Sequence, residues 1–171
     1  MIGVTVPTLE SARLRLVALD PKYFDAFAAF FASERSRFVG GPATREQAWR
    51  FLAGEIGHWT MRGYGRFAVE LHDGTFAGVV GAWNPGGWPE PEIGWELMEG
   101  HEGKGYATEA ALRVREWLYT ERGWTTAISL IDPKNYGSKG VAARLGAAYE
   151  SDWHHERYGR VEIWRHPGPH A

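Results

Sequence analysis

The 171-residue chain contains no cysteine, which excludes disulfide bonds, thiol nucleophiles and zinc–thiolate sites. It also has no apolar run long enough to cross a bilayer. The N-terminal segment MIGVTVPTLE lacks a basic stretch followed by a long apolar one, so no signal peptide is predicted. We therefore expect a cytoplasmic protein that has no membrane partner.

Dense runs of basic residues are also missing from the chain. The formal net charge is −2 and the sequence pI is about 6.4. Because a dedicated nucleic-acid-binding domain usually carries a basic stripe, no nucleic-acid partner is expected. The length favours a single domain over residues 1–171, with a disordered tail at 166–171. The sequence leaves open whether the protein is a monomer or a homodimer.

Tryptophan, by contrast, is abundant, with nine residues. Most of them are interpreted as packing residues, because an indole buries a large apolar area. Trp83 and Trp88 differ from the others because they belong to the Pro/Gly-rich segment WNPGGWPEP, where core packing has little use for them. These two are interpreted as binding residues.

Hydrophobic periodicity predicts a mixed α/β protein. Asp20-Pro21 and the pair Thr44 and Gln47 are typical of helix N-termini. The predicted strands cover residues 12–19, 65–71, 76–83, 92–98, 125–131, 147–153 and 160–165, and the predicted helices begin near residues 21, 44, 105 and 135.

The helix that begins at Thr44 carries apolar residues at helical spacing. Trp49, Leu52, Ala53 and Ile56 follow an i, i+3, i+4, i+7 pattern and share one face. This face is interpreted as core. The face beside it is then free to line a cleft.

The segment 98–110, MEGHEGKGYATEA, places three glycines in front of a helix. Backbone N–H groups at a helix N-terminus have no intrahelical partner, and glycine lets the backbone approach a phosphate closely. A plain structural turn is the alternative. Two other phosphate motifs are excluded, because Gly105 is followed by Tyr106 rather than Lys-Ser/Thr, and residue 108 is Thr rather than Gly.

The segment from Glu92 to Ala147 resembles the core of the GNAT acetyltransferases, and within them the RimJ/RimL-type branch. The family's GKGYATEA is reproduced from Gly103 to Ala110, and NYGS follows at the expected distance. The resemblance implies an α/β (α+β) GNAT fold. Its mixed, twisted central sheet would have about six to seven strands, flanked by about four helices. The sheet would be splayed at the cofactor site, between the strand ending near residue 98 and the strand beginning near residue 125.

The same resemblance implies acetyl-CoA as co-substrate. Free backbone amides near the end of strand 92–98 would face the acetyl and pantetheine groups, the glycine loop would hold the pyrophosphate, and the start of the helix near 135 would flank the pantetheine arm. The implied cofactor-binding residues are Leu97, Met98, Gly103, Lys104, Gly105, Tyr106, Ala107, Thr108, Asn135 and Ser138.

The chain departs from the family pattern at several positions. Glu102 stands where the family carries Arg or Gln, and we expect its carboxylate to point outward, since it would repel a pyrophosphate. Ala142 stands where many members carry a tyrosine general acid, so an acid must come from elsewhere. Ala147 replaces an aromatic packing residue.

Two residues are candidates for catalysis. Glu92 is the candidate base or water-orienting group, with Glu96 as a weaker candidate on the same strand face. The alternative is that Glu92 is only a solvated residue at the start of a strand. Ser138 would pass a proton to the leaving thiolate, or it would only bond to the backbone in the first turn of its helix.

No metal site is expected. His154 and His155 are adjacent on a predicted strand, so their side chains point to opposite faces, and no spaced third ligand is evident.

The predicted function is transfer of the acetyl group of acetyl-CoA to a primary amine, by direct attack in a ternary complex. The acceptor would be a protein N-terminus or a small-molecule amine such as an antibiotic. Trp83 and Trp88, with the helix that begins at Thr44, would border the acceptor cleft. The alternative from another class is an acyl-CoA-binding or degenerate GNAT module without turnover.

Overall fold

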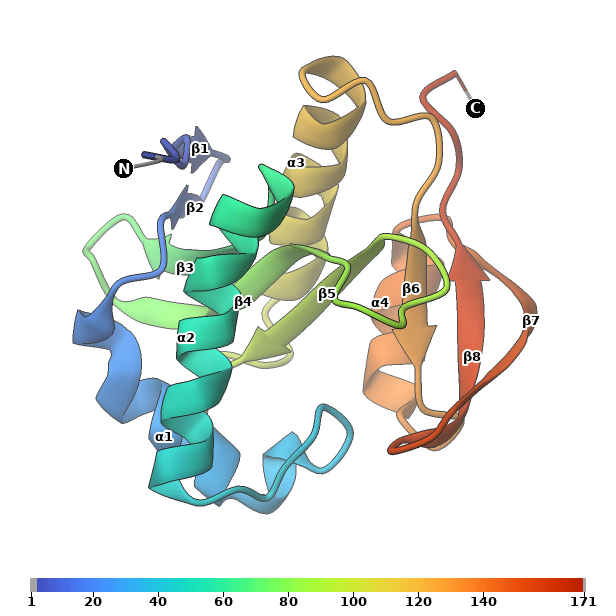
Figure 1. Cartoon of the computed structure of the whole chain (residues 1–171). Helices are drawn as coiled ribbons and strands as arrows, with labels where there is room; N and C mark the ends of the chain where they lie inside the picture. Colours follow the sequence, from blue (N-terminus) through green and yellow to red (C-terminus); the bar gives the residue numbers. More distant parts are fainter. Residues whose placement is uncertain (1–2, 171) are drawn as a thin grey trace.

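A computed structural model describes residues 3–170 and shows an eight-stranded sheet flanked by four α-helices (Figure 1). The strand order across the sheet is β1-β2-β3-β4-β5-β6-β8-β7. The strands are β1 (Leu9–Glu10), β2 (Leu14–Val17), β3 (Arg66–Leu71), β4 (Phe76–Trp83), β5 (Glu92–Leu97), β6 (Ile128–Ile131), β7 (Ala148–His155) and β8 (Gly159–Arg165). The helices are η1 (Pro21–Tyr23), α1 (Phe24–Ala32), η2 (Glu34–Ser36), α2 (Arg45–Arg62), α3 (Tyr106–Thr120) and α4 (Tyr136–Arg144), of which η1 and η2 are short 3-10 helices.

The predicted α/β class and the number of α-helices are confirmed, but the sheet has one strand more than the upper expectation. The additional strand is β1, which pairs only Leu9 and Glu10 with β2. Two residues are too few to show a period-two pattern. Their pairing was therefore invisible in the sequence.

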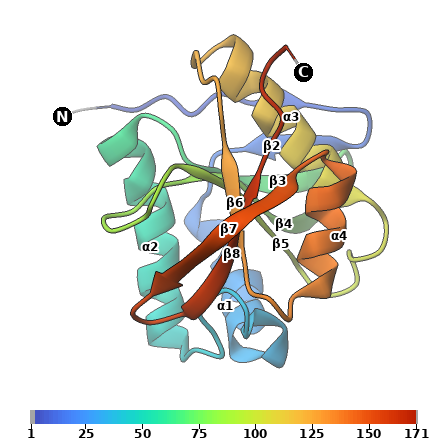
Figure 2. The same cartoon turned by 90° about the vertical axis from the view of Figure 1, so that its right-hand side faces the viewer.

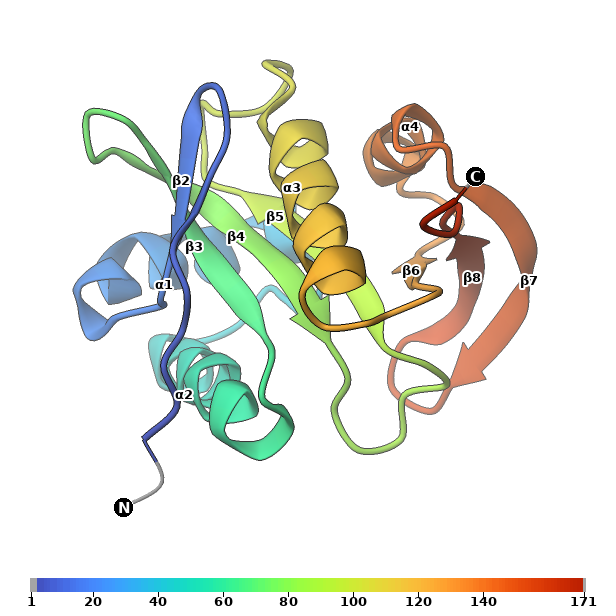
Figure 3. The same cartoon turned by 90° about the horizontal axis from the view of Figure 1, so that it is seen from above.

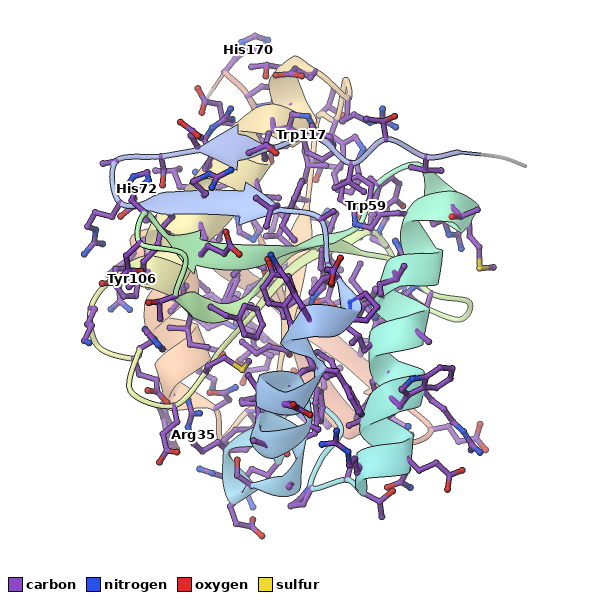
Figure 4. All side chains as sticks on the ribbon, turned by 90° about the vertical axis from the view of Figure 1, so that its left-hand side faces the viewer. Arg35, Trp59, His72, Tyr106, Trp117 and His170 are labelled. Atoms are coloured by element: carbon purple, nitrogen blue, oxygen red, sulfur yellow. The ribbon has the colours of Figure 1, made fainter. Side chains whose placement is uncertain are left out.

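Helices cover both faces of the sheet: α1 and α2 lie on one face and α3 lies on the other (Figure 3). Successive residues of a strand point to opposite faces. Accordingly, Phe67 and Val69 pack with α3, whereas Ala68 packs with α1 and α2. Near the end of α2, the ring of Trp59 lies 6.0 Å from that of Trp117 in α3 (Figure 4). The end of α2 therefore reaches the core cluster that packs against α3.

The sheet is split between β5 and β6. These neighbouring strands are parallel, and Glu92 with Ile128 is the one pair recorded in register between them in the described chain. The C-terminal half of β5 consequently has an open edge on the side of β6. Helix α3 begins at Tyr106, directly after Gly105. This is the predicted location of the split and of the helix start.

Helix caps explain where two of the helices begin. The Asp20 side chain accepts a hydrogen bond from the amide of Lys22 at the start of η1, which continues into α1. Thr44 and Gln47 form both hydrogen bonds of a capping box at the start of α2. Both starts were predicted from the sequence.

The predicted core face of α2 is wrong. Trp49 is 59% exposed and Ile56 is 37% exposed, and of the four predicted residues only Leu52 is buried. The buried face also contains Glu55 and His58, which a hydrophobicity pattern assigns to the surface. Burial of His58 is tolerated because both ring nitrogens have hydrogen-bond partners: Nδ1 donates to the Tyr64 carbonyl and Nε2 accepts from the Asn84 amide.

The predicted disorder of the C-terminal tail is wrong at its start. His166 is 3% exposed, and its amide donates to the carbonyl of Ala127 at 2.9 Å. The Tyr119 hydroxyl donates to the carbonyl of Pro167 at 2.8 Å. The segment is therefore attached to α3 and to the approach to β6, while residue 171 lies outside the described part.

His166 also forms part of a hydrogen-bonded chain across the split. Arg115 Nη1 donates to His166 Nδ1 at 3.1 Å, because a guanidinium has no acceptor. The other ring nitrogen, Nε2, therefore carries the proton and donates to Ser129 Oγ at 2.9 Å, and Ser129 donates to the carbonyl of Ile93 at 2.6 Å. Burial, followed by the nearby arginines, lowers the pKa of His166 to about 4. A neutral histidine thus ties β6 to β5.

Candidate active site

The loop before α3 depends on two glycines. Gly103 and Gly105 have φ angles of 72° and 82°, a left-handed region that glycine adopts without strain. Gly105 is the N-cap of α3 and supplies no side-chain cap. The amides of the next three residues, Tyr106, Ala107 and Thr108, therefore have no intrahelical acceptor. They form an electropositive helix N-terminus.

The connection between β1 and β2 holds this loop in place. Arg13 Nη1 donates to the carbonyl of Lys104 at 2.8 Å, and its Nε donates to Glu109 at 2.7 Å. Ser11 also donates to Glu109 at 2.7 Å. The Arg13 guanidinium lies 4.7 Å from the centre of the Tyr106 ring. These contacts hold the loop before any ligand enters.

A groove of about 830 Å³ runs from the glycine loop to the start of α4. Its wall includes eight residues predicted to contact the cofactor: Leu97, Gly103, Gly105, Tyr106, Ala107, Thr108, Asn135 and Ser138. Basic side chains outnumber acidic ones in the wall, with Arg35, Arg37, Lys134 and Arg144 against Glu96 and Glu102. Figure 4 shows Arg35 and Tyr106 along the same side of the molecule. The wall thus suits a long ligand that carries phosphates.

Two of the predicted cofactor contacts lie elsewhere. Lys104 is exposed and does not line the groove. The Met98 amide donates to the carbonyl of Ala77 at 2.9 Å, and Met98 is buried against α1 and α2, so its amide is not free. Because adjacent amides of a strand point to opposite edges, the Leu97 amide points to the open side of β5. The free amide of the splayed strand is therefore that of Leu97, not Met98.

Glu102 lies at the groove and pairs with a basic residue, contrary to the expectation that it points away. Its carboxylate forms an ion pair with Arg35 and also accepts from the Gly100 amide at 3.1 Å. Arg35 Nη2 donates to the carbonyl of Leu97 at 2.8 Å. Through these contacts, Arg35 links the segment between α1 and α2 to the glycine loop and to the end of β5. Arg35 therefore counters the negative charge that Glu102 introduces at a position where the family carries Arg or Gln.

Asn135 and Ser138 form the start of α4. The Asn135 side chain accepts from the Ser138 amide at 3.2 Å, as an N-cap does. The Ser138 hydroxyl accepts a hydrogen bond from the Trp95 indole at 3.2 Å across the split. Its own proton is therefore free for another acceptor.

A second cavity of about 500 Å³ lies on the α1/α2 face of the sheet. Trp83 and Trp88 both line it and are only partly buried, and Phe51, Gly54 and Glu55 line it from α2. The β7–β8 hairpin completes the wall beside α2 (Figure 2). The structure therefore brings together the two indoles and the α2 face that were predicted to border one cleft.

The two cavities meet at the split. Trp95, Glu96 and Ser138 line both of them. A ligand in the groove and a ligand in the second cavity would therefore meet beside the open edge of β5.

Glu92 is buried, not solvated, and both of its oxygens have partners. Oε1 accepts from the Trp88 indole at 2.9 Å, and Oε2 accepts from the Leu130 amide at 3.0 Å. Burial is the main cause that raises the Glu92 pKa, and the two hydrogen bonds oppose it. In this structure the carboxylate joins β5 to β6 and to the loop that carries Trp88. Its catalytic role stays a prediction.

The sequence analysis missed a buried ionic cluster of Glu55, Arg66 and Glu96. Arg66 Nε lies 3.5 Å from Glu55 Oε1, and Arg66 also pairs with Glu96. All three residues are less than 10% exposed, and all three line the second cavity. One signal was present in the sequence: Glu55 interrupts the apolar face of α2 between Leu52 and Trp59.

No described helix is long and apolar enough to cross a bilayer. The described residues also contain no group of three His, Cys, Asp or Glu side chains placed to hold a metal ion.

Solved structures of other proteins share the fold of this chain. A crystal structure of an acetyltransferase from Agrobacterium tumefaciens str. C58 is 33% identical, covers 97% of both chains and has a TM-score of 0.88. The RimL ribosomal L7/L12 alpha-N-protein acetyltransferase, in complex with coenzyme A, has a TM-score of 0.74. It is 16% identical and covers 94% of this chain and 98% of RimL, so this likeness concerns the fold.

Sequence comparisons give a curated relative and a family model. The uncharacterized protein YkkB of Bacillus subtilis (strain 168) is 40% identical over 58 residues, a match that spans only 34% of each chain. The model of the acetyltransferase (GNAT) domain family matches residues 13–148, which include the glycine loop, both cavities' β5 wall and the start of α4. The protein therefore belongs to the GNAT acetyltransferase family.

Proposed function

We propose that the protein is an N-acetyltransferase that transfers the acetyl group of acetyl-CoA to a primary amine. The observation that carries the proposal is the junction of the two cavities at Trp95, Glu96 and Ser138. Direct attack in a ternary complex requires both substrates to reach one point. Such a junction provides that point.

The groove fits the cofactor in three respects. The unpaired amides of the α3 N-terminus suit a pyrophosphate. Arg37, Lys134 and Arg144 add positive charge, and the groove continues from the glycine loop to the start of α4, which leaves room for a pantetheine arm. Among the structural neighbours, RimL is described in complex with coenzyme A, and the microcin C7 self-immunity acetyltransferase MccE in complex with acetyl-CoA and AMP.

The residues at the junction suit the chemistry of acetyl transfer. The Leu97 amide, on the open edge of β5, donates to the thioester carbonyl and stabilises the oxyanion that forms there. Ser138 donates its free proton toward the leaving sulfur. Two carboxylates, Glu92 and Glu55, are candidates for the base that deprotonates the amine.

The acceptor is proposed to be a protein N-terminus or a small-molecule amine. Three structural neighbours are described as ribosomal-protein acetyltransferases, and MccE is described as conferring self-immunity to microcin C7. All are at most 16% identical to this chain, so they do not decide between the two acceptor types.

A two-part experiment tests the proposal. Thermal unfolding is measured with and without acetyl-CoA, and release of free thiol is measured over a panel of N-terminal peptides and small primary amines. Stabilisation by acetyl-CoA together with amine-dependent thiol release is expected. Stabilisation without turnover on any amine would favour an acyl-CoA-binding module instead.

A further inference from the structure

The buried cluster of Glu55, Arg66 and Glu96 forms the floor of the second cavity. Glu55 projects from α2, Arg66 from β3 and Glu96 from β5. Each strand residue belongs to the sheet face covered by α1 and α2, because Ala68 on β3 and Val79 opposite Glu96 pack there. Three segments that are distant in sequence thus place one guanidinium between two carboxylates.

Two glycines make room for this arrangement. Arg66 pairs in register with Gly81 on β4, and Gly81 pairs with Gly94 on β5. Cross-strand partners point to the same face. Because Gly81 and Gly94 have no side chains on that face, the Arg66 side chain can extend over both of them. A Cβ at Gly94 would lie 3.6 Å from Arg66 Nη1. The Arg66 side chain therefore lies along the sheet surface and reaches Glu96 on β5.

The floor has more negative than positive charge. Glu55, Glu92 and Glu96 are each less than 10% exposed, and Arg66 is the buried cation among them. Glu92 uses both oxygens in hydrogen bonds, as described above. Glu55 Oε2 is buried and has no hydrogen-bond partner in the described chain, and neither oxygen of Glu96 has one, although Glu96 Oε1 lies in the ion pair with Arg66. An unpaired buried carboxylate oxygen is costly, so its presence in a cavity wall points to a ligand that supplies a donor.

The rest of the cavity wall indicates what else the ligand carries. Aromatic rings surround the floor: Phe38, Phe51, Trp83, Trp88, Trp153 and Tyr158. The His58 ring stacks on Trp83 at 4.6 Å and is held in its neutral form by two hydrogen bonds. An apolar or aromatic body therefore fits the walls, and a cation fits the floor.

We infer that Glu55 binds the ammonium group of the acceptor and is the base that deprotonates it. This rests on the proposed function and names its acceptor class: a primary ammonium on an apolar or aromatic body. The ammonium passes one proton to Glu55, and the neutral nitrogen then forms a bond to the acetyl carbon. The C–S bond breaks, the second nitrogen proton goes to the thiolate by way of Ser138, and the first proton leaves Glu55 for solvent.

The protonation behaviour of Glu55 agrees with this role. Burial, the largest cause, raises its pKa to about 7; Arg66 lowers it, and Glu96 and Glu92 raise it. The other charged groups that line the cavity are Arg37, Arg50, Arg157 and Asp132. The three arginines are exposed. A carboxylate with a pKa near neutrality releases and accepts protons at physiological pH.

Binding and turnover are tested separately on the full chain. For binding, 2-phenylethylamine and its uncharged analogue 2-phenylethanol are compared by thermal shift at pH 8. The amine is expected to raise the Tm of the wild type more than the alcohol does, and Glu55→Gln is expected to abolish that difference. Glu46→Gln is the matched control, because Glu46 lies on the same helix but is exposed and paired with Arg50. An equal amine shift in wild type and Glu55→Gln would overturn the assignment.

For turnover, thiol release from acetyl-CoA is followed against pH with 2-phenylethylamine. Glu55→Gln is expected to lower kcat about 100-fold and to remove the limb near pH 7, with the acetyl-CoA KM within about twofold of wild type. Glu55→Asp is expected to restore part of the rate. Loss of that limb in Glu92→Gln, with Glu55→Gln unchanged, would assign the base to Glu92 and refute the inference. Amine binding that depends on Glu55 without thiol release from any acceptor would instead refute only the proposed acetyl transfer.

Discussion

The groove and the second cavity are adjacent but are built from different materials. The groove combines the backbone amides around two left-handed glycines with arginine and lysine side chains and with apolar side chains such as Leu97 and Val141. The second cavity consists of side chains, with buried carboxylates on its floor and aromatic rings on its walls. Under the proposed function, one half of the site would bind an anion and the other a cation. The two halves share Trp95, Glu96, Asn135 and Ser138 at the split of the sheet, and residues 37–39 of the connection between α1 and α2.

The two halves also differ in how far apart in the sequence their residues lie. The glycine loop and the first turn of α3 form one continuous segment, so one short motif specifies the proposed phosphate site. The floor of the second cavity needs Glu55, Arg66 and Glu96, which come from three elements. Substitutions should therefore affect one half of the site without the other.

The largest expected effect concerns the pH dependence of stability. The Glu55 pKa is about 7 in the folded protein, above its ordinary 4.5, so the folded state holds more protons and stability falls as pH rises through that window. The His166 pKa is about 4, below its ordinary 6.5, so the unfolded state holds more protons and stability falls as pH drops through that window. Each difference corresponds to about 3 kcal/mol.

Because the two windows overlap between about pH 4.5 and 6.5, these contributions oppose each other in the wild type. Glu55→Gln should therefore make stability fall more steeply on acidification, and His166→Gln should make it fall more steeply toward neutral pH. Urea unfolding at four pH values between 4.5 and 7.5 measures both slopes. A Glu55→Gln slope equal to that of Glu46→Gln would show that Glu55 is not buried with a raised pKa.

A second prediction concerns a substitution that should impair acetyl-CoA binding in the groove and leave the second cavity unchanged. Gly105→Val should raise the acetyl-CoA KM about 10- to 30-fold, or about 2 kcal/mol. The valine Cβ disfavours the left-handed φ of 82° and blocks the approach of a phosphate to the loop amides. The amine KM should stay within about twofold. Steady-state kinetics in both substrates distinguishes these effects.

Gly74→Val is the matched control for that change. Gly74 also has a left-handed φ, 89°, but it lies in the β3–β4 turn and lines neither cavity. Both variants should lose stability, and only Gly105→Val should lose acetyl-CoA affinity. Equal acetyl-CoA affinity in the wild type and a folded Gly105→Val would reduce the loop to a plain turn.

The contrast between the two halves also explains what could be predicted from the sequence. The start of α3, the cap at Asn135 and the two indoles beside the cavity follow from local patterns, and the structure places them as predicted. The buried positions of Glu55 and His166 depend on partners more than 10 residues away, which no local pattern contains.

Backbone direction at the split is another property that the sequence did not reveal. The choice between Leu97 and Met98 as the free amide depends on the register between β4 and β5, which pairs Gly78 with Leu97. A shift by one residue would reverse which amide faces the groove. The resemblance located the strand but not its register.

A third prediction concerns the junction itself. If the Ser138 hydroxyl donates to the leaving thiolate, as proposed, Ser138→Ala should lower kcat about five- to tenfold, or about 1 kcal/mol, with little change in acetyl-CoA KM. Trp95→Phe should have a smaller effect, since it removes only the indole N–H that orients the hydroxyl. Ser151→Ala, on β7 and away from both cavities, is the control. A rise in the acetyl-CoA KM of Ser138→Ala without a fall in its kcat would assign Ser138 to cofactor binding alone.

The smallest expected effect tests the charge of the groove. Glu102→Gln should lower the acetyl-CoA KM about two- to threefold, because it removes a negative charge from the wall and frees Arg35 for a phosphate. Arg35→Gln should raise the KM by a similar factor. Both effects should be small, since the side chains are 49% and 28% exposed, and both should fade as salt is added. The double variant should lie near the wild type if the pair acts only through its charge. A higher KM in Glu102→Gln would mean that the carboxylate is needed to hold Arg35 and the end of β5 in place, so that its role is structural and the cationic character of the groove rests on its other basic residues.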